Sequence, residues 1–347
     1  MRAIKKVITI TDVASAAGVS TAAVCNALSG KGRMREETRN RIKEIAKELN
    51  YHPNRAASAL ARRTIVIGVL LPAWPAVIQS QLYRGITDRF NEYKEQNIEC
   101  RICYYNQQTS YSELSSFLYE NLDDLDGIII ESGNEVDDPQ VFEFIEKINQ
   151  KDIPIVSLVT STDYLKYAAV VTYNAEISGK IAAQYFQMMN RNRAVVITGF
   201  KNAPIHIRNT KGFLKSLSNT GITCVGVYEN QDQNEMSYNL TRELLLRDPD
   251  IDAIFLTNYA APAVCKCLTE MNIAKRISVV GVDIFDEIAD CIRDGSLDMT
   301  IYQNQYQSAV TAVDTMVGFF TYDANRNVTE KLIKPEIVIK SNLDCYI

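Results

Sequence analysis

The chain shows two different patterns of hydrophobic and polar positions, one before and one after about residue 64. Over residues 7–50 the apolar positions recur at helical spacing, and no strand-like alternation interrupts them. Capping and breaking residues then set the helix limits. The pattern predicts three helices, bounded by Thr9 or Thr11 and Gly18, by Ser20 and about Leu28, and by about Glu36 and Asn50. Pro53 blocks continuation of the third helix.

From Thr64 onward, buried-strand runs alternate with helical stripes. The first run, Ile65–Leu71, is followed by apolar residues at helical spacing from Ile78 to Tyr93, and such units recur to a last predicted strand at Ile337–Lys340. Repeated strand–helix units predict doubly wound parallel sheets with helices on both faces. About 280 residues of this kind suit two lobes. A cleft at the carboxyl ends of the strands is the expected binding pocket.

Composition narrows the class of protein. The 347 residues exceed one compact core, and 46% apolar with 23% charged residues is ordinary for a globular chain. No apolar run reaches the length of a membrane span, and the N-terminus lacks a secretory apolar region, so we expect a cytoplasmic protein. Eight scattered cysteines do not predict a disulfide scaffold or a metal site. Cys100 and Cys103 lie three apart in a strand-like segment and so face opposite sides.

Charge is distributed unevenly. Residues 1–63 hold 13 Lys and Arg against 5 Asp and Glu, a balance of +8, whereas the remainder has a balance of −13. A basic head on an acidic body favours a polyanion-binding module, most simply one for nucleic acid. A solvated basic segment is the alternative.

The head carries a recognisable spacing. Ala14, Gly18 and Val24 fall at A-x3-G-x5-V. A small Ala14 lets a second helix cross closely, and Gly18 supplies the backbone geometry of a tight turn. This spacing is typical of a helix-turn-helix motif, in which residues 20–28 would be the helix that enters the major groove.

Longer stretches extend the likeness. The segments Thr9–Ala14, Ala17–Ser20 and Glu48–Asn54 resemble the lac repressor family of bacterial transcription regulators, and Ala59–Ala61 resembles the end of that family's hinge helix. Pro335–Ser341 resembles its closing strand. The likeness covers nearly the whole chain. It implies a helical head at 1–53, a hinge helix at 54–63, and a ligand-binding and dimerisation body of periplasmic-binding-protein type at 64–347.

The resemblance also implies how the body divides and how DNA is bound. The first lobe is expected at about 64–170 plus 304–330, and the second at about 171–303 plus 331–347. The implied DNA-binding residues are Thr9, Thr21, Ala22, Asn26, Arg55, Ala57 and Leu60.

Three positions of the second helix depart from the family pattern: Ala23, Cys25 and Asn26 stand where Thr, Ser and Arg are usual. An asparagine binds adenine bidentately, whereas arginine prefers guanine, so Asn26 is expected to favour adenine at its base. A solvated position on the helix face is the alternative for Asn26. For Leu60, the resemblance implies a wedge in the minor groove that kinks the operator, and packing on the body is the alternative.

For the body, the resemblance implies an effector site formed by Trp74, Tyr173, Arg208, Asn258, Asp283 and Gln303. Carboxylates and amides suit a polyol because each pairs with hydroxyls at fixed geometry. Trp74 either stacks on a sugar ring or makes a dimer or lobe contact. Arg208 either reaches the ligand or is a surface cation, because the family's pocket arginine falls one residue later, at Asn209. A lone histidine such as His206 is usually structural.

These features predict a ligand-responsive regulator that binds a palindromic DNA operator as a homodimer. Its effector is expected to be a sugar or sugar derivative, which either releases the protein from DNA or strengthens its binding. No catalytic constellation, cofactor motif or metal spacing appears, so we expect neither an enzyme nor a cofactor. A solute-binding protein for sugar transport and an effector-independent DNA-binding protein are the alternatives.

Overall fold

The chain divides into two compact units, a head within Met1–Thr64 and a body comprising residues 65–93 and 98–347. The computed structural model describes residues 10–29, 34–49, 51, 64–73, 76–105, 112–131, 146–159, 161, 165–218, 220–321 and 329–347. Within those ranges, no helix is long and apolar enough to cross a membrane.

Three helices form the head, as the sequence predicts: α1 (Ile10–Ala17), α2 (Thr21–Ser29) and α3 (Glu36–Glu48). Their small apolar core is built by residues that share helical spacing, namely Val13, Ala14, Ala17, Val24, Ala27, Ile42 and Ala46. Between α1 and α2, Gly18 has a φ of 63°, a left-handed conformation that glycine adopts without a Cβ penalty.

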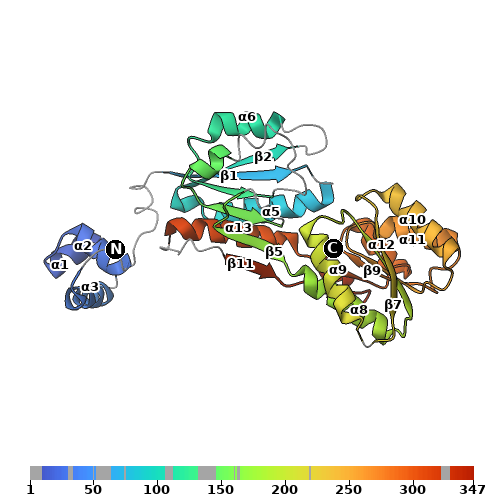
Figure 1. Cartoon of the computed structure of the whole chain (residues 1–347). Coiled ribbons are helices and arrows are strands. Elements are labelled where there is room, and N and C mark those ends of the chain that lie inside the picture. Colours follow the sequence, from blue (N-terminus) through green and yellow to red (C-terminus); the bar gives the residue numbers. More distant parts are fainter. Residues whose placement is uncertain are drawn as a thin grey trace, which may run out of the picture. The chain divides into compact units, whose positions relative to one another are not determined.

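The body contains two sheets, one in each lobe (Figure 1). The first lobe's sheet has the order β11-β5-β4-β3-β1-β2, and all of its neighbouring strands are parallel. Its strands are β1 (Ile65–Pro72), β2 (Ile98–Tyr105), β3 (Gly127–Ile130), β4 (Ile155–Leu158), β5 (Ala169–Tyr173) and β11 (Thr329–Ile333).

Helices cover both faces of this sheet because alternate strand residues point to opposite sides. Val66 and Leu70 of β1 pack with leucines of α6 (Ser112–Asn121). The intervening β1 residues pack against α5 (Ala76–Glu92) and α13 (Gln305–Thr321). A short 3-10 helix, Lys94–Gln96, follows α5.

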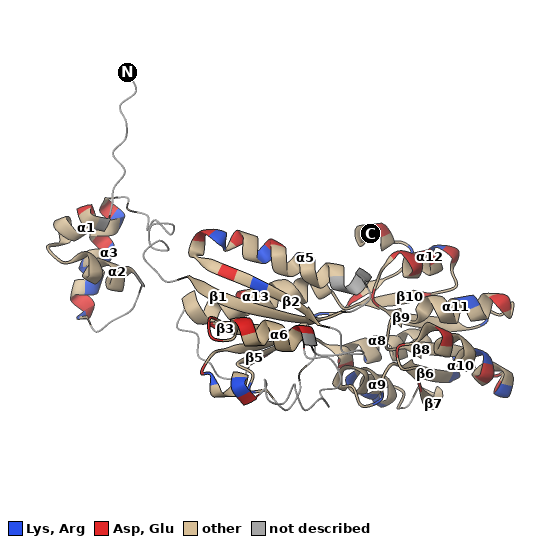
Figure 2. Cartoon of the chain, turned by 90° about the horizontal axis from the view of Figure 1, so that it is seen from above, with Lys and Arg blue, Asp and Glu red and all other residues tan. Residues whose placement is uncertain are grey.

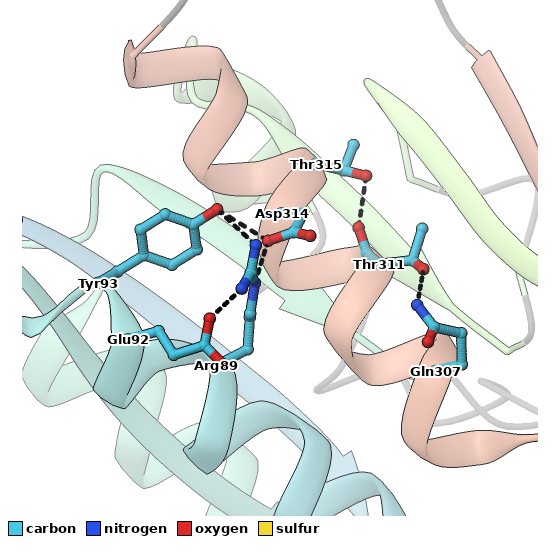
Figure 3. Close-up of polar contacts among 7 residues, drawn as sticks. All are labelled: Arg89, Glu92, Tyr93, Gln307, Thr311, Asp314 and Thr315. Carbon is cyan, nitrogen blue, oxygen red and sulfur yellow. Dashed lines mark hydrogen bonds and ion pairs between the residues drawn. The ribbon is translucent and has the colours of Figure 1, made fainter.

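Helices α5 and α13 are joined by a polar cluster (Figure 3). The Nε of Arg89 donates to Asp314 Oδ1 at 2.5 Å, and Tyr93 donates its hydroxyl proton to the same oxygen at 2.8 Å. Arg89 also pairs with Glu92 on its own helix. This cluster ties a helix from the start of the body to one near its end.

The second lobe's sheet has the order β12-β10-β9-β8-β6-β7. Its strands are β6 (Arg193–Thr198), β7 (Thr223–Glu229), β8 (Ala253–Leu256), β9 (Ser278–Val282), β10 (Met299–Tyr302) and β12 (Glu336–Val338). One face packs on α8 (Ala175–Met188) and α9 (Pro204–Ser216), and the other on α10 (Asn234–Arg247), α11 (Ala261–Glu270) and α12 (Asp286–Asp294). The 3-10 helix Leu343–Cys345 lies near the end of the chain.

Two glycines let α8 and α9 approach closely. A Cβ at Gly179 would lie 2.0 Å from the carbonyl oxygen of Asn209, and one at Gly212 would lie 2.1 Å from that of Glu176. Neither distance leaves room for a methyl group, so this contact requires glycine on both helices.

The chain passes between the lobes three times. It leaves the first lobe after β5, returns between β10 and α13, and crosses again between β11 and β12 (Figure 1). The two-lobe α/β prediction is therefore confirmed, with two refinements. β11 was not predicted, and β12 begins at Glu336 and runs antiparallel to β10.

Candidate functional site

The head offers one candidate surface, the exposed face of α2. Gly18 turns the chain after α1, and the hydroxyl of Ser20 accepts a hydrogen bond from Ala23 N at 3.2 Å, which caps α2. Val24 is buried, whereas Thr21 and Asn26 are exposed. The same helix thus anchors itself on one side and presents short polar side chains on the other.

Helices α2 and α3 differ in their content of charged residues. Helix α2 contains no charged residue, whereas α3 carries both Lys/Arg and Asp/Glu (Figure 2). On α3, the guanidinium of Arg39 donates to the carbonyl of Asn26 at 3.2 Å. An uncharged recognition face can read base edges, while cations elsewhere in the head neutralise phosphates.

Several predicted positions lie outside the described residues: Thr9, Arg55, Ala57, Leu60 and Trp74. The predicted Thr21 and Ala22 are both exposed at the start of α2. The effector-binding role of Trp74, and the DNA-binding roles of the other residues and of Asn26, remain predictions.

The body contains a cavity that encloses about 720 Å³ of empty space when the open solvent at its mouth is included. Most of its polar lining follows the carboxyl ends of strands or sits on the crossovers between lobes. The lining residues are Leu82, Val159, Tyr173, Ile205, His206, Asp232, Thr257, Asn258, Tyr259, Asp283, Gln303, Gln305 and Ser308. The predicted Tyr173, Asn258, Asp283 and Gln303 are therefore brought together.

Asp283 is the most constrained of these residues. It follows β9 with a φ of 68°, a left-handed conformation that aspartate adopts more readily than most side chains. Its Oδ1 accepts a hydrogen bond from Gln305 Nε2 at 2.5 Å. Burial, aided by the negative field of Asp232, raises the pKa of Asp283 to about 7 despite that hydrogen bond. The cavity thus contains a carboxyl group that titrates near neutrality.

A second carboxylate reaches the cavity from the loop after β7. Gln231 and Asp232 both have left-handed φ values, 51° and 55°. Asp232 Oδ1 accepts from Asn258 Nδ2 at 2.7 Å, and Asn258 Nδ2 also donates to the buried Asn230 at 2.8 Å. The Asn258 amide therefore fixes the orientation of the Asp232 carboxylate.

His206 lies beside this carboxylate. A Cβ added at Gly199, just after β6, would meet both Asp232 Oδ1 and His206 Nε2 within 2.6 Å, so glycine makes room for both. The other ring nitrogen, Nδ1, lies 2.9 Å from Thr257 Oγ1. Burial lowers the pKa of His206, which favours the neutral ring.

Two tyrosines complete the polar wall. Tyr173, buried at the end of β5, accepts a hydrogen bond from Asn209 Nδ2 at 3.1 Å. Tyr259 donates its hydroxyl proton to the carbonyl of Asp232 at 3.1 Å. Asn209 Oδ1 is buried without a hydrogen-bond partner. The cavity therefore combines aromatic rings with short polar groups.

Arg208 lines a neighbouring pocket that shares Val159 and Ile205 with this cavity. Arg208 is not among the residues that line the cavity itself, and its Nη1 pairs with Glu330 at 2.8 Å on a partly exposed surface. The register of α9 buries Asn209 and leaves Arg208 partly exposed, and its role, as a ligand contact or a surface cation, stays a prediction. Sequence reasoning missed Asp232, Gln305 and the cavity position of His206. The rule that ligands meet strand ends would have drawn attention to Asp232, which follows β7 closely.

No group of three or more His, Cys, Asp or Glu residues in the described part of the chain could hold a metal ion.

Comparisons with known proteins find matches for both the head and the body. Residues 9–54 match the family of bacterial regulatory proteins, lacI family, and residues 126–320 match the periplasmic binding protein domain. The chain is 28% identical over 283 residues to catabolite control protein A of Priestia megaterium, an alignment that covers 80% of this chain and 82% of that protein. With the protein of the same name from Staphylococcus aureus (strain Mu50 / ATCC 700699), identity is 31% over 54% of this chain and 55% of the relative.

Solved structures with this fold include sugar-binding proteins. A glucose-galactose binding protein from Geobacillus stearothermophilus is 19% identical, with 81% of this chain and 99% of that chain covered and a TM-score of 0.70. A transporter solute-binding protein from Bacillus halodurans C-125 with bound myo-inositol is 18% identical, with coverage of 82% and 97% and a TM-score of 0.67. At this identity, the likeness establishes the fold of the body.

Proposed function

This chain belongs to the lacI family of bacterial regulatory proteins and is a DNA-binding transcription regulator, and from that premise we propose that a small polyhydroxylated effector in the body cavity sets its affinity for DNA. One observation carries the proposal: a helix-turn-helix head and a polar, strand-end cavity occur on the same chain.

We propose that the protein binds a palindromic operator as a homodimer. Support comes from the exposed polar face of α2, where Thr21 and Asn26 are available to base edges. The predicted hinge at 54–63, with Leu60 as the minor-groove wedge, belongs to this proposal. So do the proposed domain limits and a cytoplasmic location.

For the effector, we propose Tyr173, Asn258, Asp283 and Gln303 as contact residues, joined by Asp232. All of them line one cavity, and their carboxylate and amide groups suit the hydroxyls of a sugar-like ligand. The structures of sugar-binding proteins with the same body fold support this ligand class.

Tyr173, Gln303 and Gln305 lie at crossovers between the lobes, so a ligand held by them would bias the angle between the lobes. That change would reach DNA binding through the hinge, and its size is limited by the ligand's differential affinity for the two states. The proposal includes both directions of the effect on operator affinity: the effector either releases the protein from the operator or strengthens its binding.

The test begins with genomic fragments that the purified protein retains at moderate salt, which are then sequenced. A common near-palindrome is expected. Asn26→Asp places a negative charge on the exposed face of α2 and should abolish retention, whereas Lys180→Ala on α8 of the body is the matched control that should retain the same fragments.

The retained operator is then titrated by fluorescence anisotropy with and without candidate effectors. A change in operator affinity supports the effector proposal. Ligand binding without retained DNA would instead favour a solute-binding protein, and specific DNA binding that no ligand alters would favour an effector-independent regulator.

A further inference from the structure

The body cavity lined by Asp232 and Asp283 has an unbalanced set of charged side chains. Asp232 and Asp283 both contribute carboxyl groups, and no lysine or arginine is among its lining residues in the described part of the chain. The only other titratable cation candidate there is His206, whose pKa burial lowers. A ligand that enters this cavity therefore meets acidic groups without a cationic counterpart.

Both carboxyl groups are positioned by neutral amides. Gln305 Nε2 donates to Asp283, and Asn258 Nδ2 donates to Asp232. An amide orients a carboxylate but does not neutralise its charge. The negative field of these two groups also raises the pKa of the lining Tyr259, after the larger effect of burial. The carboxyl groups of the cavity are therefore oriented but not neutralised, which favours a ligand with a positive charge.

Cations near the cavity are engaged elsewhere. The guanidinium of Arg84 lies 5.0 Å from the centre of the Tyr306 ring, and Arg208 pairs with Glu330. Three lysines of the α9 region line a separate pocket, which shares only His206 with the cavity lined by Asp232 and Asp283: Lys201, Lys211 and Lys215.

The remaining segments of the body add little positive charge. Those outside the described residues, at 74–75, 106–111, 132–145, 160, 162–164, 219 and 322–328, contain a single cationic residue, Arg326. The stretch 132–145 contains four acidic residues, Glu135, Asp137, Asp138 and Glu143. The amino-acid sequence therefore offers few cations that could complete the wall.

Two tyrosine rings line the cavity, and one of them contacts a buried side chain that has an unpaired oxygen. Tyr173 and Tyr259 line the cavity, and tyrosine faces attract ammonium groups. Tyr173 is only 3% exposed and its hydroxyl accepts from Asn209, while Asn209 Oδ1 is left without a partner. An unsatisfied buried polar atom is rare in native structures, and this one lies directly behind the lining Tyr173.

We propose that the effector carries a protonated amine as well as hydroxyl groups, and that Asp232 and Asp283 bind the ammonium group while Asn258, Gln303 and Tyr173 bind the hydroxyls. This inference rests on the proposed function, since it names the chemical class of the ligand at the same cavity. Anionic sugars are disfavoured there, because they would bring further negative charge beside the carboxyl groups of Asp232 and Asp283.

The experiment uses the full-length protein and a library of small metabolites in three classes: neutral, acidic and amine-bearing. Thermal shift identifies ligands, and isothermal titration calorimetry measures their Kd. Matched sets separate charge from shape: glucosamine, galactosamine and mannosamine, their N-acetyl forms, and the parent hexoses. The expected result is binding by amine-bearing polyols, with each neutral counterpart weaker by about tenfold or more.

Two variants locate the charge preference. Asp232→Asn and Asp283→Asn should reduce the affinity ratio between an amine and its N-acetyl form by about tenfold. Asp250→Asn, at an exposed carboxylate beyond α10, is the control that should keep the ratio. Far-ultraviolet circular dichroism confirms that each variant is folded.

The outcomes separate the two proposals. Ligands that are all neutral or anionic would overturn the amine inference and leave the sugar-like effector standing. Amine binding with an unchanged ratio in both Asp variants would also overturn it. If no ligand of any class binds, that result counts against the effector proposal itself, and the amine inference falls with it.

Discussion

Replacing Asp283 with Asn tests whether the cavity holds its carboxyl group at a cost to stability. Asn has nearly the same shape, adopts the left-handed φ of 68° readily, and still accepts the hydrogen bond from Gln305. The pKa of this carboxyl is raised from 3.8 to about 7 in the folded protein, mainly by burial. Between these values the folded state retains a proton that the unfolded state releases.

The sign and size follow from proton linkage. Because the native state binds more protons, the free energy of unfolding falls as pH rises from about 4 to about 7 and is flat above that. A shift of this size corresponds to about 4 kcal/mol, at about 1.4 kcal/mol for each pH unit. Asn mimics the neutral acid, so the variant lacks this loss. It should match the parent at pH 4 and exceed it at pH 8, by roughly 8 °C in melting temperature.

Differential scanning fluorimetry from pH 4 to pH 8.5 at constant ionic strength measures this difference. The variant-minus-parent difference cancels the titration of groups that the two proteins share. Asp250→Asn, an exposed site, is the control and should give a flat difference. A difference for Asp283→Asn that is also flat, or that is largest at low pH, would refute the reasoning.

Three further predictions address the head and the packing of the body. Gly179→Ala adds a Cβ that would lie 2.0 Å from the carbonyl oxygen of Asn209, so α8 and α9 must separate; we expect a loss of about 1–3 kcal/mol, read as a lower melting temperature, and an unchanged one would contradict this packing. Asp314→Asn removes the charge that holds Arg89 of α5, and because the pair is partly exposed we expect a loss of about 1 kcal/mol in urea denaturation that shrinks at high salt. A loss independent of salt would point to packing instead. Asn26→Arg should change the preferred base at one operator position from adenine to guanine in a selection from random DNA, and an identical consensus would sink the assignment.

The main architecture was predictable because hydrophobic periodicity is a local signal. Runs such as Ile65–Pro72 are buried along their length, and the following stripe forms α5. The strand β11 escaped prediction because Thr329–Ile333 is mostly exposed and pairs only at the edge of its sheet. An exposed edge strand carries neither a long apolar run nor a clear alternation, so only its tertiary partner, β5, defines it.

The site was predictable only where one rule applied. Asp283 directly follows β9 and Asn258 lies two residues after β8, so their meeting at one edge follows from the parallel sheet. The same rule draws attention to Asp232 after β7, but its path into the cavity through two consecutive left-handed residues could be seen only in the structure. The sequence left open whether Arg208 is a ligand contact or a surface cation, because a shift of one position along a helix turns a side chain by about 100° and so decides which surroundings it meets.

The three crossovers also decide how the body can be cut. A protease that cleaves one of them, for example between Tyr173 and Ala175, leaves the lobes joined by two intact connections. Neither lobe is therefore a continuous piece of the gene, and no single truncation can yield one lobe complete with all its strands. Dissecting this body by expression of fragments requires at least two separate stretches of chain for each half, whereas a nicked body can persist as a noncovalent complex.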